Sequence, residues 1–158
     1  MKTYLDKNVY EAALERIAYC FQEFDNVLVA FSGGKDSGVL LNLCYNYADE
    51  HGLLDKLTMY HLDYEAQYQM TTEYVTRTFL EQFPGIRKMW YCVPIKAQSA
   101  CALGEPYWTP WDAAKKKLWV RAMPENPYVV HEGNLDVPFR HGMVDYEFQD
   151  KLSRHFAK

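Results

Sequence analysis

A short apolar run that leads directly into a glycine-containing loop limits the fold of this chain more than any other feature. The run "VLVAF" at 27–31 is continuous and rich in β-branched residues, which is typical of a strand buried on both faces of a sheet. The loop "SGGKDS" at 32–37 follows, and apolar residues then recur at helical spacing over 39–47. A strand, a loop and a helix in this order open a parallel α/β unit.

Helices and strands alternate over the first 95 residues. A capping box at Asn8 and Glu11 predicts a helix before the first strand. Further strands are expected at 56–63 and 87–95, with a helix at 70–83 between them. This alternation, with right-handed crossovers, predicts an α/β fold of three layers, in which an open parallel sheet carries helices on both faces.

Beyond residue 95 the pattern changes, and we divide the chain into an α/β core at 1–95 and a helical and loop extension at 96–158 packed on the same domain. Thr109 as N-cap and Pro110 after it predict a helix over the basic run that follows. The segment 123–142 is expected to be loop, and 145–156 a closing amphipathic helix. With no fourth strand, the sheet would have an exposed outer edge. Either the chain is incomplete at its C-terminal end, or a partner protein or a second copy covers that edge.

The charge of the chain bears on its partners. A net charge of −4 argues against a nonspecific nucleic-acid surface, which is normally basic. The run "AAKKKLWVR" at 113–121 is the one local candidate for such a contact, and a solvated helix face is the alternative. Nucleic acid is therefore a disfavoured partner rather than an excluded one.

The cysteines and the apolar segments bear on the compartment. Cys20, Cys44 and Cys92 lie in apolar periodic segments and are expected in the core, whereas Cys101 is a lone loop thiol. The chain shows no disulfide framework, no apolar leader at its start and no apolar run of membrane-spanning length. We expect a cytoplasmic protein that does not enter a membrane.

The loop at 32–37 has the composition of an anion-binding site. Gly33 and Gly34 let the backbone bend tightly, and their N–H groups with those of the first helical turn can surround an anion. Lys35 adds a positive charge, and the hydroxyls of Ser32 and Ser37 can donate to phosphate oxygens. Asp36 would orient the loop or help to hold Mg²⁺ beside the phosphates. A glycine-rich turn without a ligand is the alternative.

"SGGKDS" after "VLVAF" resembles the PP-loop signature SGGxDS of the adenine-nucleotide alpha-hydrolase-like superfamily. The lysine at the variable position favours its phosphoadenosine phosphosulfate (PAPS) reductase group. The stretches "HLDYEAQY" and "PYWTPWDAAKKKLWVR" are similar to the IbrA-like branch of that group. The Walker A pattern does not fit, because Val29 and Asp36 stand where it needs Gly and Ser or Thr.

The resemblance implies a site for ATP or PAPS at the carboxyl ends of the strands. Residues 32–37 would hold a phosphate, pyrophosphate or sulfate group, with Lys35 and Asp36 as the candidate catalytic residues. Ala30 and Phe31 would line the adenine side. The second strand would bring further residues to the same edge. These further residues are His61, Leu62 and Asp63, with Glu65 and Gln67 as weaker candidates.

Asp63 is the second candidate ligand of Mg²⁺, besides Asp36. The resemblance implies that Asp63 contacts a ribose or a metal ion, and a helix-capping or turn residue is the alternative.

Two departures from the family pattern leave the activity open. The chain lacks the cysteine of the ECG-type motif that sulfonucleotide reductases use, and it lacks the cysteine pairs of an iron–sulfur cluster, so no cluster is expected. It also stops where this branch continues into further strands. We expect an enzyme that acts at a phosphate or sulfate group, of the PAPS reductase-like, nucleotidyl-transfer or ATP-pyrophosphatase type. The alternatives are a non-catalytic nucleotide-binding module or subunit of a larger regulatory complex, and an interaction protein that has lost its ligand.

Overall fold

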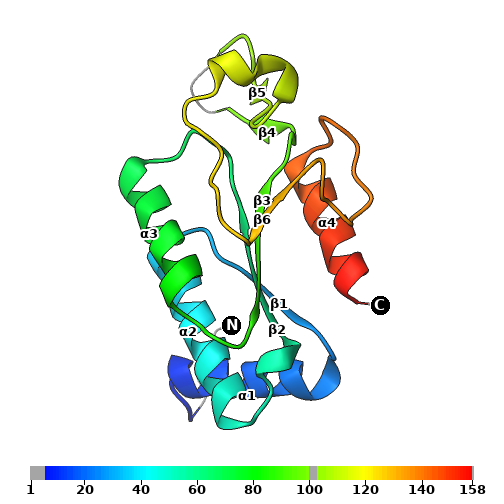
Figure 1. Cartoon of the computed structure of the whole chain (residues 1–158). Helices are drawn as coiled ribbons and strands as arrows, with labels where there is room; N and C mark the ends of the chain where they lie inside the picture. The colour runs from blue at the N-terminus through cyan, green and yellow to red at the C-terminus, as the bar shows by residue number, and fades with distance from the viewer. Residues whose placement is uncertain (1–5, 100–102, 158) are drawn as a thin grey trace.

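A computed structural model describes residues 6–99 and 103–157 and shows alternating helices and strands (Figure 1). The capping box is confirmed, since Glu11 N donates to Asn8 Oδ1 at 2.9 Å and Asn8 N donates to Glu11 Oε2 at 3.0 Å. Cys101 lies outside the described residues. The elements are α1 (Val9–Glu23), β1 (Val27–Ala30), α2 (Lys35–Glu50), η1 (Leu54–Lys56), β2 (Leu57–Leu62), α3 (Gln69–Glu81), β3 (Arg87–Cys92), β4 (Ala97–Gln98), β5 (Tyr107–Trp108), η2 (Ala113–Leu118), β6 (Val129–His131) and α4 (Asp145–Phe156).

The main sheet has four strands in the order β1-β2-β3-β6, and every neighbouring pair is parallel. The prediction of an open parallel sheet is confirmed, but the prediction of three strands, with 123–142 as loop, is wrong. Trp90 N donates to Tyr128 O at 2.8 Å, and β6 continues this pairing along β3. Because β6 has only three residues, it is too short to show a period in the sequence.

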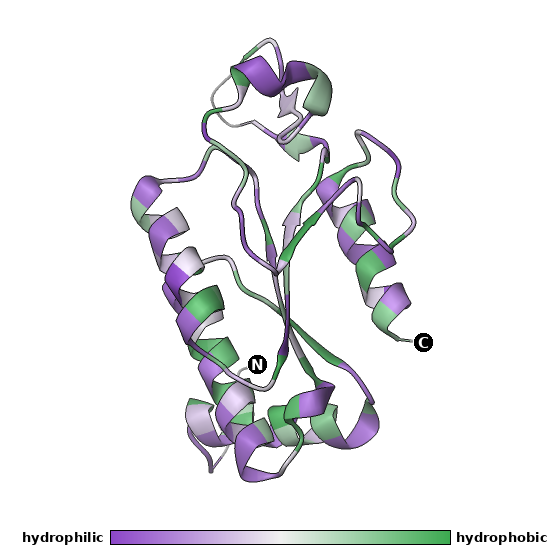
Figure 2. Cartoon of the chain, viewed as in Figure 1, coloured by the Kyte–Doolittle hydropathy of each residue, from purple (hydrophilic) through white to green (hydrophobic). Residues whose placement is uncertain are grey.

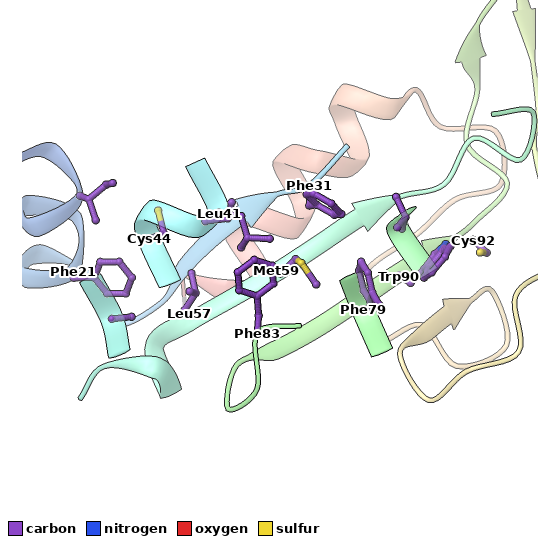
Figure 3. Packing of buried hydrophobic residues seen from close by; sticks show 14 of the residues in the cluster. Phe21, Phe31, Leu41, Cys44, Leu57, Met59, Phe79, Phe83, Trp90 and Cys92 are labelled. Carbon is purple, nitrogen blue, oxygen red and sulfur yellow. The ribbon is translucent and has the colours of Figure 1, made fainter. Parts of the chain in front are cut away.

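Helices cover both faces of the sheet, as expected for a three-layer α/β fold (Figure 1). Side chains of α1, α2 and α3 form one cluster with the strands, including Phe21, Leu41 and Phe79 (Figure 3). Phe148 and Leu152 of α4 belong to a second cluster on the opposite face. Hydrophilic and hydrophobic residues alternate around α4 in Figure 2, in keeping with one buried stripe.

Successive residues of β2 and β3 point to opposite faces, as strand geometry requires. Met59 and Trp90 therefore join the first cluster, whereas Tyr60 and Tyr91 join the second. Both clusters are buried, so the sheet packs against a hydrophobic core on each of its two faces.

Residues 96–158 contribute to both layers of the core, since they supply β6 and α4. The helix predicted to begin at Thr109 and Pro110 is wrong. The short 3-10 helix η2 starts at Ala113, after Asp112, whose Oδ1 accepts from Ala114 N at 3.0 Å. Trp111 has a positive φ of 55°, and this left-handed residue turns the chain before the helix can begin.

The core contains two of the three cysteines that were predicted there: Cys44 and Cys92 are buried, whereas Cys20 is only half-buried. Over the described parts of the chain, no helix has both the length and the apolar character needed to cross a membrane.

Candidate functional site

The loop between β1 and α2 is held against α3 by close packing. Gly33 has a φ of +82°, and a Cβ atom placed there would lie 2.8 Å from Val75 Cγ2 and 3.0 Å from Thr71 Cγ2. Only glycine combines this backbone conformation with so close an approach. Gly34 has an ordinary φ of −85° and serves as the N-cap of α2.

The two serines of the loop bond to each other and to the loop backbone. Ser37 Oγ accepts from Ser32 N at 3.2 Å and donates to Gly34 O at 3.0 Å. The two hydroxyl oxygens lie 3.0 Å apart, and Ser32 Oγ also accepts from Gly34 N at 3.3 Å. These bonds of Ser32 and Ser37 stabilise the bend, and the expected contact of the two hydroxyls with phosphate stays a prediction.

Four backbone N–H groups at the start of α2 form no hydrogen bond with the described residues. Among the described residues, no protein acceptor is present for the N–H groups of Gly33, Lys35, Asp36 and Ser37. Such unpaired N–H groups, at the positive end of a 16-residue helix, attract anions. The side chains of Lys35 and Asp36 are exposed and form no ion pair with described residues. The loop therefore offers four backbone donors and one ammonium group.

His61 lies next to Phe31, the residue before the loop, and is buried at 1% exposure. Its Nδ1 lies 2.8 Å from Phe31 O, and because a carbonyl can only accept, Nδ1 carries the proton. Burial lowers the pKa of His61 below its ordinary value, so the ring is neutral and Nε2 is an acceptor. Among the described residues, Nε2 and the Oε1 of Gln67 form no hydrogen bond, although the Gln67 side chain lies near enough to His61 to raise the pKa of the ring in part.

The other predicted adenine-side residues are also largely covered. Phe31 and Leu62 are buried and belong to the clusters on opposite faces of the sheet, whereas Ala30 is exposed at the end of β1. Phe31 and His61 therefore position the end of β1 from within the core, and the exposed groups of the site belong to the loop.

Asp63 is fully buried, and its carboxylate is enclosed by donors. Arg121 Nη2 lies 2.6 Å from each carboxylate oxygen, and Trp90 Nε1 donates to Oδ2 at 2.7 Å. Oδ1 also accepts from Glu65 N at 2.7 Å, which is the bond of a turn residue. The expected contact of Asp63 with ribose or metal does not fit this geometry, whereas the alternative of a turn residue does.

Glu65 connects the end of β2 to a distant segment of the chain. Its Oε1 and Oε2 accept from Val120 N at 2.7 Å and Trp111 N at 2.8 Å, and its backbone oxygen accepts from Arg121 Nε at 2.9 Å. Together, Asp63 and Glu65 hold residues 107–121, which we call the cap segment, over the carboxyl ends of β2 and β3 (Figure 1, upper part).

The basic run within the cap segment is divided between two environments. Arg121 is turned inward to Asp63, with 22% of its side chain exposed. Lys115 lies 3.7 Å from Asp112, and Lys116 lies 5.5 Å from the centre of the Trp119 ring. In the sequence, Arg121 is one more charge of a basic run, and its ion pair with Asp63 is not predicted. Its apolar neighbours in "LWVR" were the available signal.

The expected ligands of Mg²⁺ are the carboxylates of Asp36 and Asp63. The described residues contain no group of three His, Cys, Asp or Glu side chains that could hold a metal ion. Mg²⁺ commonly binds one or two carboxylates together with substrate phosphates and water. Asp36 fits such a single contact beside the loop, and the enclosed Asp63 does not.

Comparison with known proteins adds one relative. The chain is 29% identical over 156 residues to the uncharacterized protein YbdN of Escherichia coli (strain K12). The alignment covers 98% of this chain and 37% of YbdN, so the chain spans well under half of that relative. No family model matches the chain.

Proposed function

We propose that the loop at 32–37 binds the phosphate or sulfate group of an adenine nucleotide, ATP or PAPS. The observation that carries the proposal is the set of four unpaired N–H groups, of Gly33, Lys35, Asp36 and Ser37, at the start of α2. Their partial positive charges and the ammonium of Lys35 are complementary to an oxyanion. The resemblance of "SGGKDS" to the PP-loop signature supports the adenine nucleotide over other anions.

The same groups would support chemistry at the bound phosphorus or sulfur. Backbone donors fixed at the start of a helix stabilise negative charge that develops on a leaving oxygen, and Lys35 adds to this effect. A nucleotide-bound Mg²⁺ would neutralise further phosphate charge next to Asp36. In this proposal the protein is an enzyme of the ATP-pyrophosphatase or nucleotidyl-transfer type, or a PAPS reductase-like one.

A non-catalytic nucleotide-binding module is the second candidate. Its support is the low reactivity of the two buried thiols. Burial raises the pKa of Cys44 to about 11, and burial next to Asp63 raises the pKa of Cys92 far above its ordinary value. Neither thiol suits a nucleophile. The module would bind the nucleotide at the same loop and leave the reaction to another chain.

Binding is tested by thermal unfolding of the whole chain with ATP, PAPS or pyrophosphate, each with and without Mg²⁺. A ligand at a hundredfold excess over its dissociation constant should stabilise the fold by about 2.7 kcal/mol. Lys35→Ala should abolish most of this gain. Lys117→Ala is the matched control, because Lys117 is exposed and forms no ion pair with described residues. Equal stabilisation of both variants, or none of the unaltered chain, contradicts the proposal.

A product assay separates the two candidates. Release of pyrophosphate or AMP from ATP, or of sulfite from PAPS with a thiol reductant, identifies an enzyme. Binding without turnover identifies the module.

The proposal extends to the compartment and to partners. Cys20, Cys44 and Cys92 are free thiols, which suits a reducing cytoplasm. β1 and β6 end the strand order, so a second copy or a partner protein could pair with either edge. The internal contacts of Lys115 and Lys116 favour a solvated face over a nucleic-acid contact.

A further inference from the structure

A cavity of about 280 Å³ opens between the cap segment and the side chains of Glu65 and Glu105, and no residue of the loop at 32–37 lines it. Its walls include three aromatic side chains, and carboxylates and one ammonium lie among them. The lining residues that the argument uses are Glu65, Glu105, Tyr107, Trp108, Lys115 and Trp119. Nothing in the nucleotide proposal accounts for this cavity.

Among the described residues, no cation pairs with the buried carboxylate in this cavity. Glu65 is 4% exposed, its carboxylate oxygens accept from the backbone N–H groups of Trp111 and Val120, and Arg121 Nε donates to its backbone oxygen. The exposed Glu105 forms no ion pair with described residues. The ammonium of Lys115 lies 3.7 Å from Asp112 instead. The cavity therefore holds two carboxylates that form no ion pair with the described residues, together with the ammonium of Lys115.

The aromatic walls are held in place and already attract cations. Trp119 Nε1 donates to Asp112 O at 3.1 Å, and its ring packs edge-on against Trp111 at 5.2 Å. The ammonium of Lys96 lies 4.2 Å from the centre of the Tyr107 ring. Aromatic faces next to carboxylates are the surroundings in which proteins bind ammonium groups.

We propose that this cavity binds a small organic cation, an alkylammonium or quaternary ammonium group. The charge of the guest faces Glu65 and Glu105, and its alkyl groups contact Trp108 and Trp119. The guest is either a free small molecule or a lysine side chain of a partner. The proposal does not depend on nucleotide binding, because no residue of the loop lines the cavity.

The test is a titration of the whole chain with choline, agmatine or Nα-acetyl-lysine methylamide, without nucleotide and at constant ionic strength. The readout is the NMR signal of each indole N–H, assigned by Trp→Phe substitution. Saturable shifts are expected at Trp108 and Trp119. Trp90 is the internal control, since it is buried beside Asp63. The uncharged choline isostere 3,3-dimethylbutan-1-ol should bind at least about tenfold more weakly.

Two variants test the walls without removing the buried carboxylate. Trp108→Leu should weaken choline binding about tenfold, and Glu105→Gln several-fold, with the Trp90 signal unchanged as proof of folding. Lys115→Met should strengthen binding, because it removes the competing ammonium. Tighter binding of the lysine derivative than of choline and agmatine indicates a partner's side chain, and the reverse indicates a free molecule. Equal binding of choline and its uncharged isostere, or no saturable shift with any of the three cations, overturns the proposal.

Discussion

Removing the guanidinium of Arg121 should be among the most damaging single changes in this chain. Asp63 has a fully buried side chain, and both of its oxygens lie 2.6 Å from Arg121 Nη2. In Arg121→Met the carboxylate would keep only its neutral donors. Removing one partner of a buried ion pair typically costs about 3–5 kcal/mol, because the remaining charge stays out of water.

The assay is equilibrium unfolding in urea, with circular dichroism as the probe. Arg140→Met is the matched control, since Arg140 lies 3.4 Å from Glu147 on the surface, with 71% and 37% of the two side chains exposed. An exposed pair of this kind contributes about 0–1 kcal/mol. If Arg121→Met costs no more than this control, the buried pair does not stabilise the fold as argued.

A double variant shows whether the loss of stability in Arg121→Met comes from the unpaired buried charge of Asp63 or from lost packing. Asp63→Asn combined with Arg121→Met removes both charges, so it should be more stable than Arg121→Met alone. If the double variant is as unstable as the single one, the loss comes from the contacts of the arginine side chain, such as its guanidinium 4.9 Å from the Trp111 ring centre.

Three further predictions concern the loop, the buried histidine and the thiols. Gly33→Ala should cost about 2–4 kcal/mol in urea unfolding, from its positive φ and the close approach to α3, whereas Gly34→Ala should change stability by less than about 1 kcal/mol. Burial lowers the pKa of His61, so the contribution of the neutral ring to stability should be complete above the ordinary pKa of 6.5. Below that pH the free energy of unfolding should fall by at most about 1.4 kcal/mol per pH unit, and His61→Asn should weaken this fall. If the variant shows the same slope between pH 7.5 and 5.5 as the unaltered chain, His61 is not the cause. Iodoacetamide at pH 8 should label Cys20 before the buried Cys44, whose pKa is raised to about 11, and mass spectrometry showing equal labelling would count against this order.

The first 95 residues could be predicted closely because their signals are local. The capping box of α1, the buried run of β1 and the spacing in α2 each depend on residues within one or two turns of one another. The later elements lack such signals. β6 has three residues and forms because β3 offers an unpaired edge. η2 begins late because Trp111, whose N–H donates to Glu65, has a positive φ. These elements depend on partners far away in the chain.

The amino-acid sequence alone indicated the loop, since two glycines, a lysine and a following helix favour a bend whose N–H groups can face an anion. Packing against α3 and the bonds of Ser32 and Ser37 hold that bend. Tertiary structure decided the roles of Asp63, Glu65 and Arg121. Asp63 and Arg121 are 58 residues apart, and no local pattern distinguishes a carboxylate that will meet a guanidinium from one that will face solvent. Only the path of the chain, which returns the cap segment to the ends of β2 and β3, brings these charges together and buries them.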